Sequence, residues 1–321
     1  MPTALVTGAA GFIGSHLVEG LLERGYRVRG LDNLTTGDRT NLDDVWDSES
    51  FAFVEGDIRD AETVRQAMAD VDSVFHQAAF VSVPGSVEHP ARATDVNCTG
   101  TATILEAARD QNVERVVCAS SAAVYGSDPP VPTPEDALLV PESPYAHSKR
   151  YGEQLAAQLD VETVALRYFN VFGPKQDPAG EYAAVIPAFI ERMLDDQRPV
   201  IYGDGEQTRD FVSVRDVVDA NVCAAETDLG RTEGTDGGAS GADGTVHTYN
   251  VASGERISIT ELVETLNDLL GTTLDPIYAD PRPGDVRHSG ADISRTQEAL
   301  GYESRVGFRE GLDETIAFFH K

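Results

Sequence analysis

Three residues, Ser121, Tyr145 and Lys149, could together move a proton on or off an alcohol. The apolar run at 115–119 is typical of a strand, and it leads directly into the serine pair that ends with Ser121. A helix is predicted to start near Pro144. The four-residue spacing of Tyr145 and Lys149 then places phenol and ammonium on one helix face.

The chemistry explains why these residue types would lie together. A phenol is a poor base at neutral pH because its pKa is near ~10. A nearby fixed cation, or the positive charge of a bound nicotinamide, would favour the phenolate and lower that pKa. A serine hydroxyl could hydrogen-bond the substrate oxygen and keep it within reach of the phenolate. A tyrosine and a lysine at this spacing are common by chance, so the functional interpretation depends on the strand-end serines and on a second motif.

That second motif is a glycine-rich turn near the N-terminus. The apolar run at 3–7 enters Gly8-Ala9-Ala10-Gly11-Phe12-Ile13-Gly14, after which residues 15–22 have helical periodicity. Glycines between a strand and a helix let the backbone approach a pyrophosphate, whose charge then lies at the helix N-terminus. The spacing is Gly-x-x-Gly-x-x-Gly, not the Gly-x-Gly-x-x-Gly of the simplest dinucleotide folds.

Acidic residues follow the next two predicted strands. Asp32 and Asn33 end the strand at 26–31, and Asp57 ends the strand at 50–58. An acidic residue about twenty positions after the glycines is expected to accept hydrogen bonds from the adenosine ribose diol. Its charge would also repel a ribose phosphate, so NAD is expected over NADP. Asp57 could accept a hydrogen bond from the adenine amine.

Further predicted strands cover 71–79, 115–119 and 161–170. Strands that alternate with helices at this rhythm predict an α/β fold, a doubly wound, Rossmann-like parallel sheet. Ligands belong at the carboxyl ends of such strands, where small residues after the fourth strand leave room for a cofactor. His76 within that strand is interpreted as a core residue without chemistry.

After Asn170 the composition shifts toward proline, glycine and aromatics, which predicts a smaller C-terminal α/β region. Helices are expected at 91–111, 180–192, 214–226, 259–270 and 308–319, with a strand and loop at 199–211. The Gly/Asp-rich stretch 228–247 has no apolar periodicity, so it is interpreted as a mobile acidic loop without an assigned function.

The net charge of −29 restricts the choice of partners. A surface rich in Asp and Glu repels polyanions, so neither nucleic acid nor an anionic membrane is expected as a partner. Such a surface is typical of salt-adapted proteins, and we expect a halophilic protein. Lysine occurs only at Lys149, Lys175 and Lys321. In a chain with so few lysines, one placed four residues after Tyr145 is less readily explained as an ordinary surface residue.

The sequence predicts a cytoplasmic protein without a metal. A strand-like run follows Met1 almost at once, and no apolar run is long enough to span a bilayer. The three cysteines have neither disulfide nor metal spacing.

Together these residues resemble the extended short-chain dehydrogenase/reductase family, and within it the UDP-hexose 4-epimerases. The likeness covers nearly the whole chain except the acidic loop. It lies in Thr7 to Gly14, Asp32-Asn33, Gly56-Asp57-Ile58, His76-Gln77-Ala78-Ala79, Ser120 to Gly126, Tyr145 with Lys149, Arg167 to Pro174, and Thr208-Arg209-Asp210-Phe211. The combination of Gln176-Asp177-Pro178 with Tyr182 to Pro187 is most similar to the branch that handles UDP-N-acetylglucosamine.

The resemblance implies an NAD-binding Rossmann-like domain over 1–170, to which the helix at 214–226 returns, and a mainly UDP-sugar-binding region over 171–321. It implies that Tyr145 is the general base and acid, that Lys149 holds the nicotinamide ribose and lowers the tyrosine pKa, and that Ser121 bonds the sugar 4-oxygen. The implied cofactor site also contains Gly8, Gly11, Phe12, Ile13, Gly14, Asp32, Asn33, Asp57, Ile58, Gln77, Ala78, Ala79, Asn97 and Tyr168. The implied substrate site contains Ser121, Asn170, Val185, Tyr202, Arg209, Arg282, Asp285 and Ser289.

General chemistry agrees with these roles. A guanidinium fork binds phosphate oxygens bidentately, which suits Arg209 and Arg282 to a pyrophosphate, and Tyr202 could pack on uracil. Ser289 aligns with a gate position that is aromatic in relatives restricted to plain hexoses. Its small side chain leaves room for an N-acetyl group.

Several alternatives stay open. Members that dehydrate or decarboxylate the sugar need an extra acidic residue beside the strand-end serine, whereas this chain has Ala122 and Ala123. A UDP-glucuronate 4-epimerase would need a cation near C6 of the sugar, and the sequence does not place one. A net dehydrogenase that releases NADH, or a non-catalytic NAD-binding regulator, are further candidates. In many relatives the helices that hold Asn97 and Tyr145 pair two subunits, so a homodimer is expected.

Overall fold

The fold is built on a seven-stranded parallel sheet. The computed structural model describes residues 1–178, 184–229, 246–281 and 286–320. The strands lie in the order β11-β6-β5-β4-β1-β2-β3, and every neighbouring pair is parallel. They are β1 (Thr3–Thr7), β2 (Arg27–Asp32), β3 (Phe51–Glu55), β4 (Ser73–His76), β5 (Arg115–Ser121), β6 (Thr163–Tyr168) and β11 (Val246–Val251). The predicted doubly wound α/β fold is confirmed.

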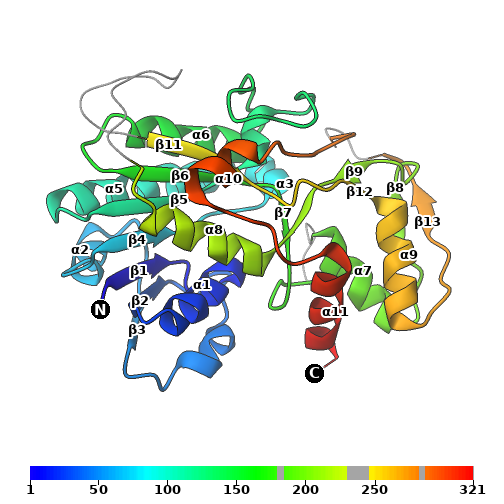
Figure 1. Cartoon of the computed structure of the whole chain (residues 1–321), viewed down its shortest axis with the longest axis horizontal. Helices are drawn as coiled ribbons and strands as arrows, with labels where there is room; N and C mark the ends of the chain where they lie inside the picture. Colours follow the sequence, from blue (N-terminus) through cyan, green and yellow to red (C-terminus); the bar gives the residue numbers. More distant parts are fainter. Residues whose placement is uncertain (179–183, 230–245, 282–285, 321) are drawn as a thin grey trace.

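Helices cover both faces of the sheet (Figure 1). Alternate residues of β1 enter different apolar clusters, because neighbouring side chains of a strand point to opposite faces. Ala4 and Val6 pack with α1 (Phe12–Glu23) and α8 (Val214–Glu226). Leu5 packs on the other face with α2 (Ala61–Ala67), α5 (Gly100–Asp110) and α6 (Pro144–Ala156). A sheet buried on both faces needs the nearly continuous apolar strands that the sequence shows.

The long helical segment predicted around Asn97 is continuous but not regular. It consists of α4 (Pro90–Thr94), a π-helical turn (Asp95–Thr99) and α5. Asn97 lies within the π-helical turn. Such turns are rare and are frequently found at functional sites.

The C-terminal elements form a third apolar cluster beside the sheet (Figure 1). It joins α7 (Val185–Leu194), α9 (Ile259–Leu270) and α11 (Phe308–Phe319) to β8 (Val200–Tyr202) and β10 (Phe211–Ser213). Phe172 of β7 (Asn170–Phe172) contacts Phe211 and Phe308 edge-on, and β7 pairs with β10. The predicted helices at 214–226, 259–270 and 308–319 are confirmed with the same bounds.

The remaining short elements connect these layers. They are the 3-10 helices η1 (Arg39–Val45) and η3 (Ala122–Tyr125), the helices α3 (Val83–Glu88) and α10 (Ser294–Leu300), and the strands β9 (Thr208–Arg209), β12 (Ile257–Ser258) and β13 (Ile277–Ala279).

Three predictions of local structure were wrong. Of the helix expected at 180–192, Ala184 is extended and α7 runs from Val185 to Leu194, while residues 180–183 lie outside the described residues. The acidic loop was expected to reach residue 247, but Val246 and His247 belong to β11, which extends the main sheet beside β6. The sixth strand was expected to run from 161 to 170, whereas β6 ends at Tyr168 and β7 begins a separate two-stranded sheet. The rest of the acidic stretch, 230–245, lies outside the described residues.

The acidic composition predicts a salt-dependent stability. We expect the melting temperature to rise from dilute buffer to molar potassium chloride, because the charge of −29 repels itself and ~1 M salt reduces the screening length to about 3 Å. Thermal unfolding in a potassium chloride series tests this, with sucrose as the uncharged control. Equal melting temperatures at low and molar salt would contradict it.

No described helix is long and apolar enough to cross a membrane.

Candidate functional site

The helix α6 presents Tyr145 and Lys149 toward the end of β5. Ser143 caps this helix by accepting a hydrogen bond from the backbone N–H of Ala146 at 3.1 Å, and Pro144 occupies the first turn. Lys149 Nζ lies 5.8 Å from the centre of the Tyr145 ring. The predicted common face of Tyr145 and Lys149 is therefore present in the structure.

Burial changes the acidity of the phenol. Tyr145 is 9% exposed. Burial raises the pKa of Tyr145 above its usual value, and a hydrogen bond with Ser121 partly opposes that rise. The group that lowers this pKa in the structure is Ser121, and the lowering by the Lys149 charge that the resemblance implies stays a prediction. The phenol alone is therefore protonated at neutral pH.

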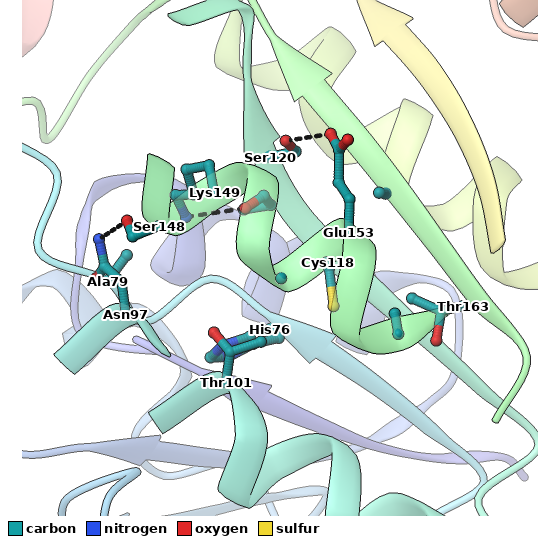
Figure 2. Close-up of a pocket in the computed structure, with 14 residues that line it drawn as sticks. His76, Ala79, Asn97, Thr101, Cys118, Ser120, Ser148, Lys149, Glu153 and Thr163 are labelled. Atoms are coloured by element: carbon teal, nitrogen blue, oxygen red, sulfur yellow. Dashed lines mark hydrogen bonds between the residues drawn. The ribbon is translucent and has the colours of Figure 1, made fainter. Parts of the chain in front are cut away.

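Lys149 is held by the strand rather than by the phenol. Its Nζ donates a hydrogen bond to the carbonyl oxygen of Ala119 at 2.8 Å (Figure 2). Burial lowers the pKa of Lys149 to about 8, because a low-dielectric surrounding disfavours the charged form. The ammonium thus keeps its charge at neutral pH, close to the ring of Tyr145.

Asn97 connects α6 to the loop that follows β4. Its Oδ1 accepts from the backbone N–H of Phe80 at 2.7 Å, and its Nδ2 donates to the Phe80 carbonyl and to Ser148 Oγ (Figure 2). Asn97 is 3% exposed. Its amide positions the helix that carries Tyr145 and Lys149, and nothing in the sequence pattern indicated Ser148 as its partner.

His76 is a core residue, as predicted. Its ring nitrogens pair with the hydroxyls of Thr7 at 2.8 Å and Thr101 at 3.0 Å. Burial lowers the pKa of His76 to about 3, so the imidazole is neutral.

The glycine-rich turn is as close-packed as a phosphate-binding turn requires. A Cβ on Gly14 would lie 1.9 Å from the carbonyl oxygen of Gly8, and Gly8 itself has a φ of +69°. Phe12 and Ile13 open α1, and no side chain caps the helix at Gly11. The N–H groups of the first turn are therefore available to a ligand anion.

The acidic residues predicted to bind adenosine lie together at the sheet edge. Asp32 accepts from the backbone N–H groups of Ala10 at 2.9 Å and Leu34 at 2.8 Å, while burial raises its pKa. Asn33 Nδ2 donates to Asp57 Oδ2 at 2.9 Å. Hydrogen bonds from Arg59, a partner that the sequence analysis missed, hold the pKa of Asp57 below its usual range.

Other predicted cofactor residues pack behind this edge. Ile58 is buried, and a Cβ on Gly100 would lie 2.4 Å from its side chain. Gln77 donates to Asn221 Oδ1 at 3.0 Å and accepts from Tyr168 OH at 3.2 Å. Ala78 N–H donates to Thr7 Oγ1 at 3.2 Å. Ala79 lines the small cavity beside Lys149 (Figure 2).

A cavity of about 870 Å³ lies between the sheet and the C-terminal elements. Six residues predicted to contact substrate line it, together with Tyr168: Ser121, Asn170, Val185, Tyr202, Arg209 and Ser289. Arg282 and Asp285 lie outside the described residues. The structure thus gathers residues from β5, β7, α7, β8 and β9 around one space, and Ser121 links that space to Tyr145.

Residues 4–236 match the model of the NAD dependent epimerase/dehydratase family. The chain belongs to this family. Its relatives include the UDP-glucose 4-epimerase of Mycolicibacterium smegmatis, 41% identical over 98% of this chain and 97% of the relative.

Solved structures give the same family and more than one sugar. The UDP-N-acetylglucosamine 4-epimerase from Methanobrevibacter ruminantium M1, in complex with UDP-N-acetylmuramic acid, is 38% identical with a TM-score of 0.90 over 99% of this chain and 98% of that one. The UDP-glucuronic acid 4-epimerase from Bacillus cereus, in complex with UDP-glucuronic acid and NAD, is 30% identical with a TM-score of 0.87 over 99% of both chains. The chain is thus an NAD-dependent member of the UDP-sugar 4-epimerases, an isomerase family that acts on several sugars.

The glycine turn and Asp32 fit the family's cofactor. A side chain at Gly8 or Gly14 would collide with the backbone of the protein, and the first turn of α1 can receive a pyrophosphate. Each Asp32 oxygen accepts one described backbone bond and keeps a lone pair for a ribose hydroxyl. Among the residues that the structure describes, no group of three or more His, Cys, Asp or Glu side chains could hold a metal ion.

A buried ion pair behind the site was missed from the sequence. Arg167 of β6 holds Glu153 of α6 through two hydrogen bonds of 2.9 Å. Ser120 donates to the same carboxylate at 2.7 Å (Figure 2). Arg167 also donates to Tyr125 OH at 2.9 Å. Glu153 follows Lys149 by four residues and so shares its helix face, and this was the one signal in the sequence that could have indicated the pair.

Proposed function

We propose that the protein is a 4-epimerase of UDP-hexoses that converts UDP-glucose and UDP-galactose, and also their N-acetylated counterparts, through a transient 4-keto sugar. The observation that carries the proposal is the position of Tyr145 beside Lys149 on α6, with Lys149 Nζ 5.8 Å from the centre of the Tyr145 ring, next to a strand end whose Ser121 lines the large cavity. This places a proton acceptor at the carboxyl end of β5, where parallel sheets bind ligands.

The protein residues hold the sugar and move its proton. Tyr145 takes the proton of the 4-hydroxyl and later returns it, and Ser121 holds the 4-oxygen in reach. The ammonium of Lys149 favours the charged phenolate and is held in place by the Ala119 carbonyl. Bound NAD supplies the hydride exchange at C4, and we propose that the protein retains it tightly between turnovers.

The cavity residues suit a UDP group. Arg209, with Arg282, would bind the pyrophosphate, and Tyr202 would pack on uracil. Asn170, Val185 and Asp285 would complete the substrate contacts. In this proposal residues 1–170 and the helix α8 form the NAD-binding unit, and most of 171–321 binds the UDP-sugar.

A single assay tests the function. Purified protein is incubated with UDP-galactose, UDP-N-acetylgalactosamine or UDP-galacturonate without added NAD, and the products are identified. We expect conversion of the first two substrates and not of UDP-galacturonate. The only Lys or Arg among the described cavity residues is Arg209, which leaves no second cation for a uronate carboxylate. Absence of any 4-epimer would overturn the proposal. A 4,6-dehydrated product is not expected, since Ala122 and Ala123 cannot remove a second proton.

Ser289 is proposed to set the preference for N-acetylated sugars. Ser289→Tyr is expected to lower kcat/KM for UDP-N-acetylgalactosamine about tenfold or more relative to UDP-galactose, because the larger side chain fills space in the cavity. Steady-state kinetics with both substrates measure the ratio. Ser289→Ala is the matched control and should keep it. If the ratio of kcat/KM for the two substrates were unchanged in Ser289→Tyr, Ser289 would not set the preference for N-acetylated sugars.

We also propose a homodimer that pairs through the helices bearing Asn97 and Tyr145. Tyr151 on α6 is 39% exposed in the single chain and would be covered by the partner. Light scattering coupled to size exclusion measures the assembly, and a monomer at micromolar concentration would contradict the proposal.

A further inference from the structure

Two glutamine side chains in the large cavity have an amide oxygen without a partner. Among the described residues, four buried side-chain nitrogen or oxygen atoms make no hydrogen bond, and two of these are Gln176 Oε1 and Gln207 Oε1. Both glutamines line the large cavity. A buried acceptor without a donor is unfavourable, so in a binding cavity it points to a ligand group that donates.

Gln207 is the more firmly held of the two. It is 7% exposed, and its Nε2 donates to the Tyr202 carbonyl oxygen at 2.8 Å. Its own backbone carbonyl accepts from the Ile259 N–H at 3.1 Å, where α9 begins. Gln176 is only partly buried, and its Nε2 bond to the Val171 carbonyl is 3.2 Å long.

These contacts fix the orientation of the Gln207 amide. The amide nitrogen donates to the Tyr202 carbonyl oxygen, so a flipped amide would place Gln207 Oε1 against that carbonyl oxygen, and both atoms are acceptors. The oxygen therefore remains the free acceptor. Gly203 lies beside this oxygen, because a Cβ built on it would be 3.6 Å from Gln207 Oε1. As a glycine it has no side chain that could cover the oxygen.

The surroundings indicate the donor. Gln207 is anchored to the backbone of Tyr202, an aromatic residue that lines the same cavity and is 38% exposed. A planar base packed on that ring would place its edge near the Gln207 amide. Uracil has an imide N–H donor on its pairing edge, whereas cytosine has an acceptor nitrogen at the same position.

We propose that Gln207 Oε1 accepts a hydrogen bond from the imide N–H of uracil and so selects uridine over cytidine nucleotides. This rests on the proposed function, from which the uridine nucleotide comes. Gln207 contributes to nucleotide specificity and has no part in the proton transfer at the sugar.

Binding of analogues to the NAD-loaded protein tests the assignment. Calorimetry compares UDP, N3-methyl-UDP, CDP and 2′-deoxy-UDP on the wild type and on Gln207→Met, which keeps the side-chain length but removes the acceptor. The wild type should bind UDP roughly tenfold or more tightly than N3-methyl-UDP and CDP. In Gln207→Met both preferences should largely disappear, while any cost of removing the 2′-hydroxyl should be the same in both proteins.

Each other outcome has a defined meaning. Equal wild-type affinities for UDP and N3-methyl-UDP, or an undiminished preference in the variant, would overturn the proposal. If Gln207→Met abolishes the cost of 2′-deoxy-UDP instead, the oxygen serves the ribose and the assignment to the base is wrong. If the methionine variant fails to fold, the wild-type comparison of UDP with N3-methyl-UDP and CDP decides, because only an acceptor that faces the imide N–H makes both analogues bind more weakly. Wild-type protein that binds no UDP would overturn the proposed function itself.

Discussion

Tyr145→Phe is expected to reduce turnover of UDP-galactose by about 10³-fold, within the range found for a removed general acid–base group. The phenol would be the group that takes the 4-hydroxyl proton, and Ser121, which bonds it, cannot replace it as a base. The ring packing is retained in phenylalanine, so the fold and the content of bound NAD should be unchanged. Turnover is measured with UDP-galactose, and NAD is quantified after denaturation of the protein.

The control for this prediction lies on the same helix. Tyr151→Phe removes a hydroxyl from a residue that is 39% exposed on α6, and it should leave turnover near the wild-type value. If Tyr145→Phe retained turnover similar to that of Tyr151→Phe, the phenol of Tyr145 would have no role in the proton transfer.

The pH dependence should carry the signature of the same pair. Burial raises the pKa of Tyr145 and lowers the pKa of Lys149 to about 8, because it favours the uncharged form of each group. We therefore expect kcat/KM to rise from neutral pH as the phenol ionises, and to rise less steeply once Lys149 loses its charge above about pH 8. Lys149→Arg keeps its charge at alkaline pH and should move that change in slope upward. Identical profiles in the two proteins would contradict the role of the Lys149 charge.

Local signals predicted most of the sheet and much of the candidate site. The residues at strand ends, Asp32 and Ser121, could be placed because parallel strands share one carboxyl edge. The pairing of Tyr145 with Lys149 followed from helix geometry alone. In each case the relevant contact depends on neighbours in sequence or on a shared edge.

What the sequence could not predict depends on partners distant in the chain. The strand β11 lacks apolar alternation, and it directly follows a long acidic stretch in the sequence, so its first residue could not be recognised. Its partner β6 is distant in the chain. Burial, which raises the pKa of Tyr145, results from the packing of several elements and is not encoded in a motif. The partners of Gln207 and Arg167 come from separate segments, and a lone glutamine or arginine has no spacing pattern to reveal them.

The largest stability effect is expected from the buried ion pair. Arg167→Met should lower the free energy of unfolding by about 3 kcal/mol, because it leaves the buried Glu153 carboxylate with only Arg150, a partly exposed residue, as its charged partner. Arg167 is 3% exposed and Glu153 is 5% exposed. Burial alone would raise the pKa of Glu153, but the hydrogen bonds and charge of Arg167 lower it overall. The carboxylate is thus ionised at neutral pH, and the pair stabilises the fold until the pH falls below the usual range of a glutamate. Urea denaturation at fixed salt measures the loss.

Two further variants separate charge burial from general damage. Arg167→Met combined with Glu153→Leu should recover part of the stability, since no buried charge is left unpaired and the remaining partner, Arg150, is partly exposed to solvent. Arg65→Met breaks an exposed pair with Glu62 and should change stability by less than about 1 kcal/mol. An Arg167→Met variant no less stable than Arg65→Met would show that the buried pair contributes little.

The ion pair also connects stability to the site. Glu153 lies two helical turns beyond Tyr145 on α6, and it holds Ser120, the neighbour of Ser121, through a bond of 2.7 Å. The Glu153 carboxylate thereby joins the helix that carries Tyr145 to the strand that carries Ser121, and Arg167 holds that carboxylate in place. Loss of this connection should lower turnover even under conditions where Arg167→Met remains folded, whereas Arg65→Met should not. Because catalytic groups must be held within a fraction of an ångström, a folded Arg167→Met protein with full turnover would show that α6 is positioned by its other contacts alone.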